Sequence, residues 1–337
     1  MSAQPLLRVT GLRKYFPVRG GLFGRKVADV QAVDGISFEV ARGETLGIVG
    51  ESGCGKSTTA RLLIRLIQPD AGETIFDGLG LGDGLTLAEL RRQVQMVFQD
   101  SYASLNPRLT AADSIAFGPR VHGMAAAASR DLARELLRKV GLDPTLFAGR
   151  YPHELSGGQR QRVNIARALA LSPRLLLLDE AVSALDKSVE AQVLNLLCDL
   201  KAELGLTYVF ISHDLSVVRY MSDRVMVMYL GKVVEIGAVD EIYADPRHPY
   251  TAALLSAMPS IDPDRRTEQA PLAGDPPNPI DPPPGCRFHT RCPFAEEPCR
   301  RVEPGLRPAG DRRQVACHMN DPASGHGRAG RHGRQEA

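Results

Sequence analysis

The chain has 337 residues, of which 43% are hydrophobic and 24% charged, a composition typical of proteins that fold around a buried core. Lysine and arginine total 41 against 39 aspartate and glutamate residues, so the net charge of +2 gives no general electrostatic reason to expect nucleic-acid binding. No apolar run approaches the roughly eighteen residues of a membrane span, and residues 1–9 lack the regions of a signal peptide, so we expect a cytosolic protein.

Short apolar runs alternate with amphipathic helical patterns through residues 6–258. The runs TLGIVG (45–50), LLLLDE (175–180) and TYVFISH (207–213) are continuous, which is typical of strands buried on both faces of a parallel sheet. Apolar residues at helical spacing predict a helix over 187–205. Strands that alternate with helices indicate an α/β core.

Composition divides the chain into three stretches. Residues 1–258 are expected to form the α/β domain, into which residues of about 101–168, without a convincing strand, insert a helical subdomain. The segment 271–284 holds seven prolines in fourteen residues, which indicates an extended linker. We therefore expect a small irregular, cysteine-containing extension over 259–320 and, because it lacks apolar periodicity, a disordered tail over 321–337.

The segment GESGCGKST (50–58) matches the phosphate-binding pattern G-x-x-x-x-G-K-[ST]. Its glycines let successive N–H groups point at the β-phosphate, Lys56 reaches the β- and γ-phosphates, and the Ser57 hydroxyl ligates Mg²⁺. The segment follows a predicted strand and opens a predicted helix, whose N-terminus adds partial positive charge. We interpret Cys54 as a space-filling residue and not as a redox sensor. The candidate ATP-binding residues of this segment are Gly50, Ser52, Gly53, Cys54, Gly55, Lys56, Ser57 and Thr58.

Two carboxylates end the strand LLLLDE. Asp179 is expected beside the Mg²⁺ of a P-loop site, and Glu180 follows it into the same cleft, where a carboxylate can polarise or deprotonate the attacking water. The alternative is an acidic pair that merely faces solvent, which the four leucines before it, in a chain with a P-loop, argue against.

A second loop rich in backbone donors opens another predicted helix and is therefore a second candidate anion site. If this loop faces away from the P-loop of its own chain, it must serve a nucleotide bound by another molecule, which implies a head-to-tail pair of subunits. The residues of this loop are Leu155, Ser156, Gly157, Gly158 and Gln159.

Over residues 6–258 these motifs together resemble the ATP-binding cassette (ABC) proteins. LSGGQ is similar to the family signature, MVFQD to the Q-loop with Gln99, and ISHDL carries the switch histidine, His213. The one departure is Ala181, where many relatives have proline; we expect it to shape the loop and not the chemistry. SALD is similar to the D-loop, with Ser183, Ala184, Leu185 and Asp186.

The segment LRKYF (12–16) resembles the aromatic A-loop of the family. Phe16 aligns best as the residue that stacks on adenine, with Tyr15 as the alternative. The expected fold is thus a P-loop ABC ATPase core with antiparallel N-terminal strands, a helical subdomain and the C-terminal extension.

The resemblance also implies roles for the catalytic residues. Glu180 polarises water, His213 senses the γ-phosphate, and Gln99 links Mg²⁺ and water to the helical insertion. The signature loop is expected to contact ATP held by the partner subunit, and Asp186 belongs to the loop that couples the two sites. The expected Mg²⁺ ligands are Ser57, Gln99 and Asp179.

Finer resemblance points to the ATPases of dipeptide and oligopeptide importers, most closely to the second, dipeptide-type ATPase. The importer resemblance rests on FQDSYASLNPRLT (98–110), RYPHELSGGQRQR (150–162), DPRHPYTAALLSAMPS (245–260) and the cysteine-rich extension. The dipeptide type rests on LRKYFPVRGG (12–21) and AVDGISFEVARGETLGIVGESGCGKST (32–58). It implies a peripheral protein on the cytoplasmic face of the inner membrane, whose ATP hydrolysis drives peptide import. The implied partners are a second ABC ATPase in a heterodimer, two membrane permeases and an extracytoplasmic binding protein, with no nucleic acid.

Two alternatives stay open. An importer of another small cargo, such as nickel or glutathione, has similar ATPases. A soluble ABC protein that acts on ribosomes or DNA is disfavoured, because the chain has one P-loop, one signature and no heptad array. An exporter with a fused membrane domain is excluded by the absent spans. The segments 101–108 and 118–123 are expected on the face that docks to the permease, unless they are ordinary surface loops.

Of the six cysteines, four lie in the extension with the spacing C-x5-C-x6-C-x17-C, unlike the tight pairs of zinc ribbons. Four thiolates in a loop-rich segment suit a tetrahedral metal or an iron–sulfur cluster, while free thiols or a labile disulfide are the alternative. The resemblance to peptide-importer ATPases implies a 4Fe–4S cluster, with zinc as runner-up. The expected ligands are Cys286, Cys292, Cys299 and Cys317, with His289 and His318 as substitutes.

Overall fold

The computed structural model of the protein describes residues 4–20, 25–258 and 274–330. These residues form a mixed α/β fold, as the sequence predicts, and divide into two compact units. Unit 1 takes its described residues from 1–7, 40–45 and 75–212, and unit 2 takes them from 8–39, 46–74 and 213–337.

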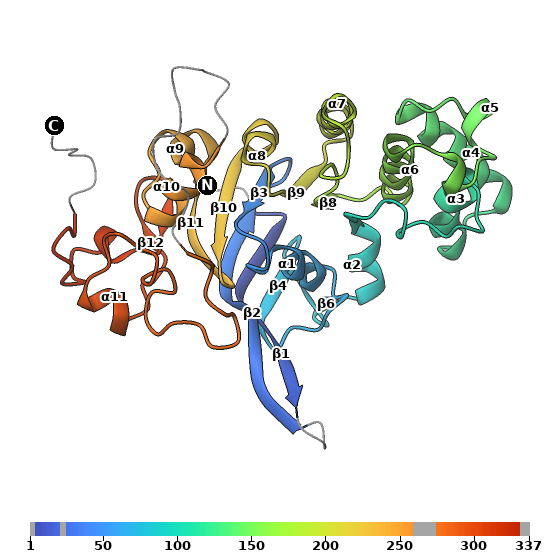
Figure 1. Cartoon of the computed structure of the whole chain (residues 1–337). Helices are drawn as coiled ribbons and strands as arrows, with labels where there is room; N and C mark the ends of the chain where they lie inside the picture. Colours follow the sequence, from blue (N-terminus) through green and yellow to red (C-terminus); the bar gives the residue numbers. More distant parts are fainter. Residues whose placement is uncertain (1–3, 21–24, 259–273, 331–337) are drawn as a thin grey trace. The chain divides into compact units, whose positions relative to one another are not determined.

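The strands and helices are labelled in Figure 1. The strands are β1 (Leu7–Gly20), β2 (Arg25–Val40), β3 (Thr45–Val49), β4 (Ala71–Phe76), β5 (Leu79–Leu81), β6 (Gly84–Leu85), β7 (Val94–Val97), β8 (Leu175–Asp179), β9 (Thr207–Ile211), β10 (Arg224–Tyr229), β11 (Lys232–Ala238), β12 (Arg307–Pro308) and β13 (Gln314–Val315). The helices are α1 (Lys56–Leu63), α2 (Leu87–Gln93), α3 (Ala111–Val121), α4 (Ala126–Lys139), α5 (Pro144–Phe147), α6 (Gly157–Leu169), α7 (Lys187–Leu204), α8 (Leu215–Met221), α9 (Val239–Ala244), α10 (Pro249–Ser256) and α11 (Glu297–Arg301), with 3₁₀ turns at Pro152–Glu154 and His318–Asn320. None of the described helices has the length and hydropathy needed to cross a bilayer.

In unit 1, β8 lies between β7 and β9, and all three strands run parallel. Leu175 lies opposite Val94 on one side, and Leu178 lies opposite Phe210 on the other. Every residue of β8 and β9 is buried, which explains why both strands read as continuous apolar runs and not as alternating ones. The strands predicted from LLLLDE and TYVFISH are therefore confirmed.

The segment 101–168 contains helices and no strand. Within it α3, α4 and α6 pack on one another, and fully buried apolar side chains such as Ile115, Leu137 and Val163 form their core (Figure 1). The helix expected over 187–205 is α7, which ends at Gly205 in the left-handed conformation (φ 62°), a common helix stop.

In unit 2, β3 pairs in parallel with β10, and β10 pairs antiparallel with β11. The extension then adds β13 to the free edge of β11, with Val315 opposite Glu235, and β12 pairs with β13. These antiparallel pairs were not predicted from the sequence. The extension is thus part of a sheet, although its loops are irregular.

A buried ion pair fastens the extension to β11. The Glu235 side chain is 0% exposed and accepts hydrogen bonds from Arg313 Nε (2.9 Å) and Nη2. The same carboxylate accepts the backbone N–H groups of Arg247 (3.1 Å) and His248 (3.0 Å). Because a buried carboxylate is costly unless it is paired and hydrogen-bonded, Glu235 requires the arginine that the extension brings.

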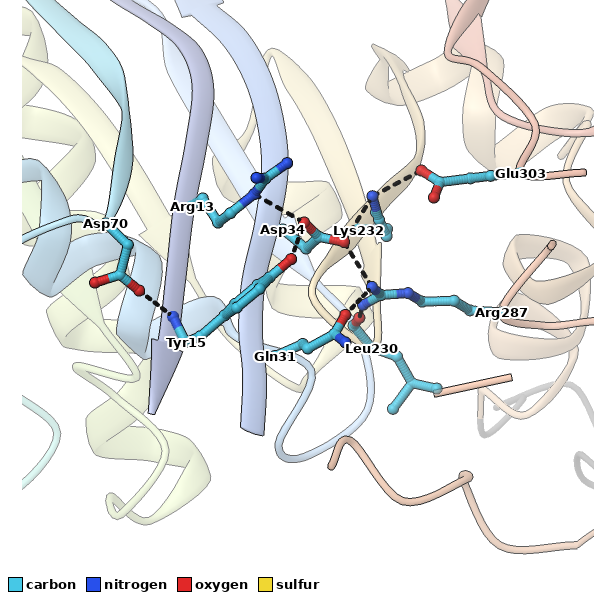
Figure 2. Close-up of polar contacts among 9 residues, drawn as sticks. All are labelled: Arg13, Tyr15, Gln31, Asp34, Asp70, Leu230, Lys232, Arg287 and Glu303. Atoms are coloured by element: carbon cyan, nitrogen blue, oxygen red, sulfur yellow. Dashed lines mark hydrogen bonds and ion pairs between the residues drawn. The ribbon is translucent and has the colours of Figure 1, made fainter. Parts of the chain in front are cut away.

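Asp34 is a second buried carboxylate of unit 2 and is shown in Figure 2. Its side chain, 9% exposed, accepts the Tyr15 hydroxyl (2.6 Å) and lies 2.8 Å from Lys232 Nζ and 2.6 Å from Arg287 Nη2. Burial by itself raises the pKa of Asp34, but the hydrogen bonds from Lys232 and Tyr15 outweigh it and lower that pKa. Asp34 therefore stays ionised and joins β1, β2 and β11 to the extension.

An aromatic cluster lies at the junction between the core and the extension. The ring of Tyr229 lies 4.6 Å from that of Tyr250 and 5.3 Å from that of Phe288, which comes from the extension. His248 lies 5.8 Å from Phe288, and burial lowers the pKa of His248 to about 3, so the imidazole is neutral. The junction is thus apolar at its centre and charged at its edges.

The described part of the tail packs on the extension. His326 is buried with Nε2 2.9 Å from Phe294 O, and Gly327 N donates to Glu296 (2.7 Å). These contacts differ from the disorder expected for 321–337, because hydrogen bonds to residues 32 and 31 positions earlier order this part of the tail without apolar periodicity. Residues 259–273 and 331–337, which hold part of the predicted linker and tail, lie outside the described residues.

Candidate nucleotide-binding site

The P-loop, residues 50–58, joins β3 to α1 in unit 2. Gly50 and Gly55 have φ of 152° and 105°, and a Cβ would lie 2.2 Å from Met228 O at Gly50 and 2.1 Å from Ala32 O at Gly55. No other residue type fits these two positions. Local sterics therefore explain the first and last glycines of the motif.

Lys56 is the first residue of α1 and is 5% exposed. Its Nζ donates to Gly50 O (2.7 Å) and Glu51 O (3.0 Å), so the ammonium lies inside the curl of the loop. Burial raises the pKa of Cys54, which keeps that thiol protonated and fits a space-filling role. Ser57 and Thr58 are half-buried, while Ser52 and Gly53 are exposed.

Two contacts to the P-loop were not predicted from the sequence. The hydroxyl of Tyr250 accepts the Glu51 backbone N–H (2.9 Å), and Arg291 Nη1 donates to Glu51 Oε2 (2.8 Å). The RHPYT segment marked Tyr250 only as a family feature. No pattern marked Arg291, which lies 240 positions from Glu51 in the chain.

In unit 1 the Q-loop and the end of β8 meet. Gln99 Nε2 donates to Glu180 Oε2 at 2.9 Å, and Asp179 is 3% exposed at the end of the strand. Glu180 has φ of 49°, a left-handed conformation that costs a non-glycine residue free energy. Its N–H donates to Ile211 O (2.9 Å) and its carbonyl accepts the Ser183 hydroxyl (3.0 Å), which hold it there. Ala181, the departure from the family pattern, is buried.

The LSGGQ loop lies at the N-terminus of α6, also in unit 1. Ser156 Oγ accepts the Gln159 N–H (3.3 Å), and Gln159 Oε1 accepts the Ser156 N–H (2.9 Å), which is a capping box. A Cβ on Gly158 would lie 2.4 Å from Val189 Cγ1, whereas a Cβ on Gly157 would lie at an ordinary 3.6 Å from Leu185 Cδ2 of the D-loop. Helix capping and the burial of Leu155 thus fix the conformation of this loop.

The D-loop leads into α7, with Asp186 at the helix N-cap position and Ala184 between Ser183 and Leu185. His213 follows β9, is exposed, and belongs to unit 2. Unit 2 therefore holds the P-loop and His213, whereas unit 1 holds Gln99, Asp179, Glu180, the signature and the D-loop.

The two A-loop candidates lie on β1. The Tyr15 hydroxyl donates to Asp34 and its N–H donates to Asp70 Oδ2 (2.6 Å), as Figure 2 shows. Burial and the Asp34 hydrogen bond raise the pKa of Tyr15 to about 12. The Lys14 ammonium lies over the ring of Phe16, with Nζ 5.6 Å from the ring centroid. Because the Tyr15 side chain is hydrogen-bonded to Asp34, Phe16 is favoured as the residue that stacks on adenine.

The four cysteines of the extension line one pocket of unit 2, together with His248, His289, His318 and His326. Burial, with a smaller effect of neighbouring thiols, raises the pKa of Cys286 and of Cys317 to about 12. His289 and His318 each have one ring nitrogen 2.8 Å from a backbone carbonyl. Among the described residues, no three His, Cys, Asp or Glu side chains are arranged to hold a single metal ion.

Two family models match the chain: the ABC transporter model over residues 33–183, and that of the oligopeptide/dipeptide transporter C-terminal region over residues 234–299. The chain is 52% identical over 328 residues to the oligopeptide transport ATP-binding protein AppF of Bacillus subtilis (strain 168), covering 94% of this chain and 98% of that protein. It is 50% identical over 321 residues to the dipeptide transport ATP-binding protein DppF of Haemophilus influenzae, covering 94% and 97%.

Among solved structures, cbiO1 from Clostridium perfringens, part of the ABC transporter complex cbiONQ, is similar with a TM-score of 0.61 and 28% identity. The match covers 71% of this chain and 91% of that one. The chain therefore belongs to the ABC transporter family, among the ATP-binding proteins of the oligopeptide and dipeptide branch.

Proposed function

We propose that this chain is the ATP-hydrolysing subunit of a membrane transporter that imports dipeptides or oligopeptides. The observation that carries the proposal is that one chain combines the Gln99–Glu180 pair and the P-loop with a C-terminal region of the oligopeptide/dipeptide transporter family. The relatives named above serve oligopeptide and dipeptide transport, which supports peptide over nickel or glutathione as cargo.

Hydrolysis forms a bond from the water oxygen to the γ-phosphorus and breaks the bond to the β–γ bridging oxygen, so that ADP and phosphate leave. The Glu180 carboxylate, oriented by Gln99 Nε2, polarises that water, and the Lys56 ammonium offsets phosphate charge. Mg²⁺ bound with ATP would supply further charge neutralisation. The residues proposed to hold Mg²⁺ are Ser57, Gln99 and Asp179, and His213 is the proposed γ-phosphate sensor.

The capped N-terminus of α6 supports the proposed role of the signature loop. Its backbone N–H groups and helix dipole favour an anion, and a chain with its own P-loop has no need of a second phosphate site for the same nucleotide. We therefore propose that Ser156, Gly157 and Gly158 contact ATP held by a second ABC ATPase, in a heterodimer whose D-loops couple the two sites.

The substitution Glu180→Gln tests the catalytic assignment. Glutamine keeps the shape and the hydrogen bond from Gln99 but is a far weaker base, so ATP binding should stay within about twofold and turnover should fall by about 100-fold or more. Phosphate release and peptide uptake by the assembled transporter are the measurements. Glu135→Gln, on an exposed face of α4, is the matched control and should behave as the parent does. Parental turnover in Glu180→Gln would refute the assignment.

Peripheral attachment to the cytoplasmic face of the membrane, through two permeases, is the remaining part of the proposal. Large apolar side chains of the helical segment support it, because Tyr102, Phe117 and Val121 are 51%, 60% and 66% exposed. Tyr102 and Val121 belong to the segments 101–108 and 118–123, which are expected on the docking face, and Phe117 directly precedes the second of them.

Gentle solubilisation of membranes that contain the tagged chain tests these partners. We expect mass spectrometry of the co-purified proteins to identify two polytopic membrane proteins and a second ABC ATPase, with an extracytoplasmic binding protein that joins when peptide is added. The double substitution Phe117→Asp and Val121→Asp should lose the membrane proteins and keep ATP binding. Co-purification with ribosomal proteins alone would contradict the transport proposal.

We also propose that the extension holds a 4Fe–4S cluster. The four thiols line one pocket, and four cysteine thiolates are the donor set that such a cluster takes. Each thiolate of a 4Fe–4S cluster binds a different iron, and the four cysteines of the pocket supply one thiolate for each. A bound cluster would cross-link four points of the extension.

Iron and sulfide analysis of anaerobically purified protein tests the cluster. We expect about four irons and four sulfides per chain, and Cys292→Ser should lose most of both because three thiolates bind a cluster poorly. Cys198→Ser, which removes a thiol of α7 outside the pocket, should keep them. Zinc without iron, or neither metal, would overturn this assignment.

A further inference from the structure

The extension reaches the P-loop through one side chain. Arg291, which directly precedes Cys292, is 6% exposed and donates from Nη1 to Glu51 Oε2 (2.8 Å) and from Nη2 to Glu51 Oε1 (3.1 Å). Two parallel hydrogen bonds between a guanidinium and a carboxylate fix both groups in plane and orientation. The hydrogen bond with Glu51 raises the pKa of Arg291 above its ordinary value.

Glu51 is an unfavourable residue for a loop that binds a triphosphate. It is the second residue of the motif, directly after Gly50, and its carboxylate adds negative charge to a phosphate-binding loop unless a cation compensates for it. Arg291 is that cation, since the ion pair leaves the Glu51 side chain 24% exposed and its oxygens both bonded. The Tyr250 hydroxyl holds the Glu51 backbone from the same side.

The arginine is itself held by the junction between core and extension. Its guanidinium lies 6.0 Å from the ring centroid of Tyr229, which packs edge-on against Phe288. These contacts place the guanidinium before any nucleotide binds, so no side-chain entropy is lost at that step.

Arg287 supports the P-loop by a second route, and Figure 2 shows its contacts with Gln31, Asp34 and Leu230. It donates to Leu230 O and to Gln31 Oε1 (2.5 Å), besides its ion pair with Asp34. The next residue in the chain, Gly231, donates its N–H to Cys54 O of the P-loop (2.9 Å). The turn between β10 and β11 thus lies between the extension and the phosphate loop.

We propose that Arg291 is a positioning residue of the ATP site: it neutralises and orients Glu51, so that the cysteine-bearing extension sets the affinity of the P-loop for ATP. The proposal rests on the assignment of residues 50–58 as the ATP site. Arg291 acts through Glu51 and does not take part in bond making, so its loss weakens nucleotide binding and leaves the chemical step intact.

The test is a set of variants of the full chain, purified anaerobically and titrated with a fluorescent ATP analogue. Arg291→Ala should raise the dissociation constant by about tenfold, because it leaves the Glu51 carboxylate uncompensated. Arg291→Lys keeps the charge and loses the second hydrogen bond, so its dissociation constant should lie between those of the parent and of Arg291→Ala. In the assembled transporter, kcat of Arg291→Ala at saturating ATP should stay within about twofold of the parent, while KM rises.

The double variant Glu51→Gln with Arg291→Ala distinguishes this role from general support of the fold. Removing the carboxylate should recover most of the lost affinity for ATP, because repulsion caused the loss. The proposal would be overturned if Glu51→Gln did not recover that affinity, or if Arg291→Ala bound ATP as tightly as the parent. The control is Arg301→Ala, since Arg301 is 77% exposed and pairs with Glu297 inside the extension. Lys56→Ala should abolish binding, and parental binding in that variant would instead refute the ATP site itself.

Discussion

Two buried carboxylates of unit 2, Asp34 and Glu235, are the constraint on which the C-terminal half of the structure depends. Each lies in the β-structure of the core and pairs with an arginine from the extension: Arg287, beside Lys232 of the core, at Asp34 and Arg313 at Glu235. A buried carboxylate without its cation is strongly destabilising, by about 3–5 kcal/mol when one partner of such a pair is removed. The core therefore needs the extension as much as the extension, with its small strands and few buried apolar residues, needs the core.

The regular elements could be predicted because their own residues determine them. The run Leu175–Leu178 is apolar at every position since both faces of β8 are covered, and α7 carries a helical apolar stripe. The P-loop glycines and the capping box at Ser156 are local as well. Sequence pattern is sufficient wherever the deciding contacts lie within a few residues of one another.

The junction could not be predicted for the opposite reason. β12 and β13 span two residues each, too short for any periodic signal, and they form only because β11 offers a free edge. The pairing of Arg291 with Glu51 joins residues 240 positions apart, and an arginine among many gives no sign of its partner. The alternative between Tyr15 and Phe16 likewise depended on Asp34, whose proximity to Tyr15 arises from strand pairing. The identity of residue 180 as glutamate does not indicate that its backbone adopts the left-handed conformation.

The extension is part of the nucleotide-binding unit and not an appendage, which hydrogen–deuterium exchange of the full chain can test. Arg287→Ala should accelerate exchange at the turn of residues 229–231 and at residues 50–54 of the P-loop, because the turn loses its support and Gly231 bonds to Cys54. Exchange in α3 and α4 of unit 1 should stay as in the parent. Acceleration confined to residues 274–330, with the P-loop unchanged, would contradict the account.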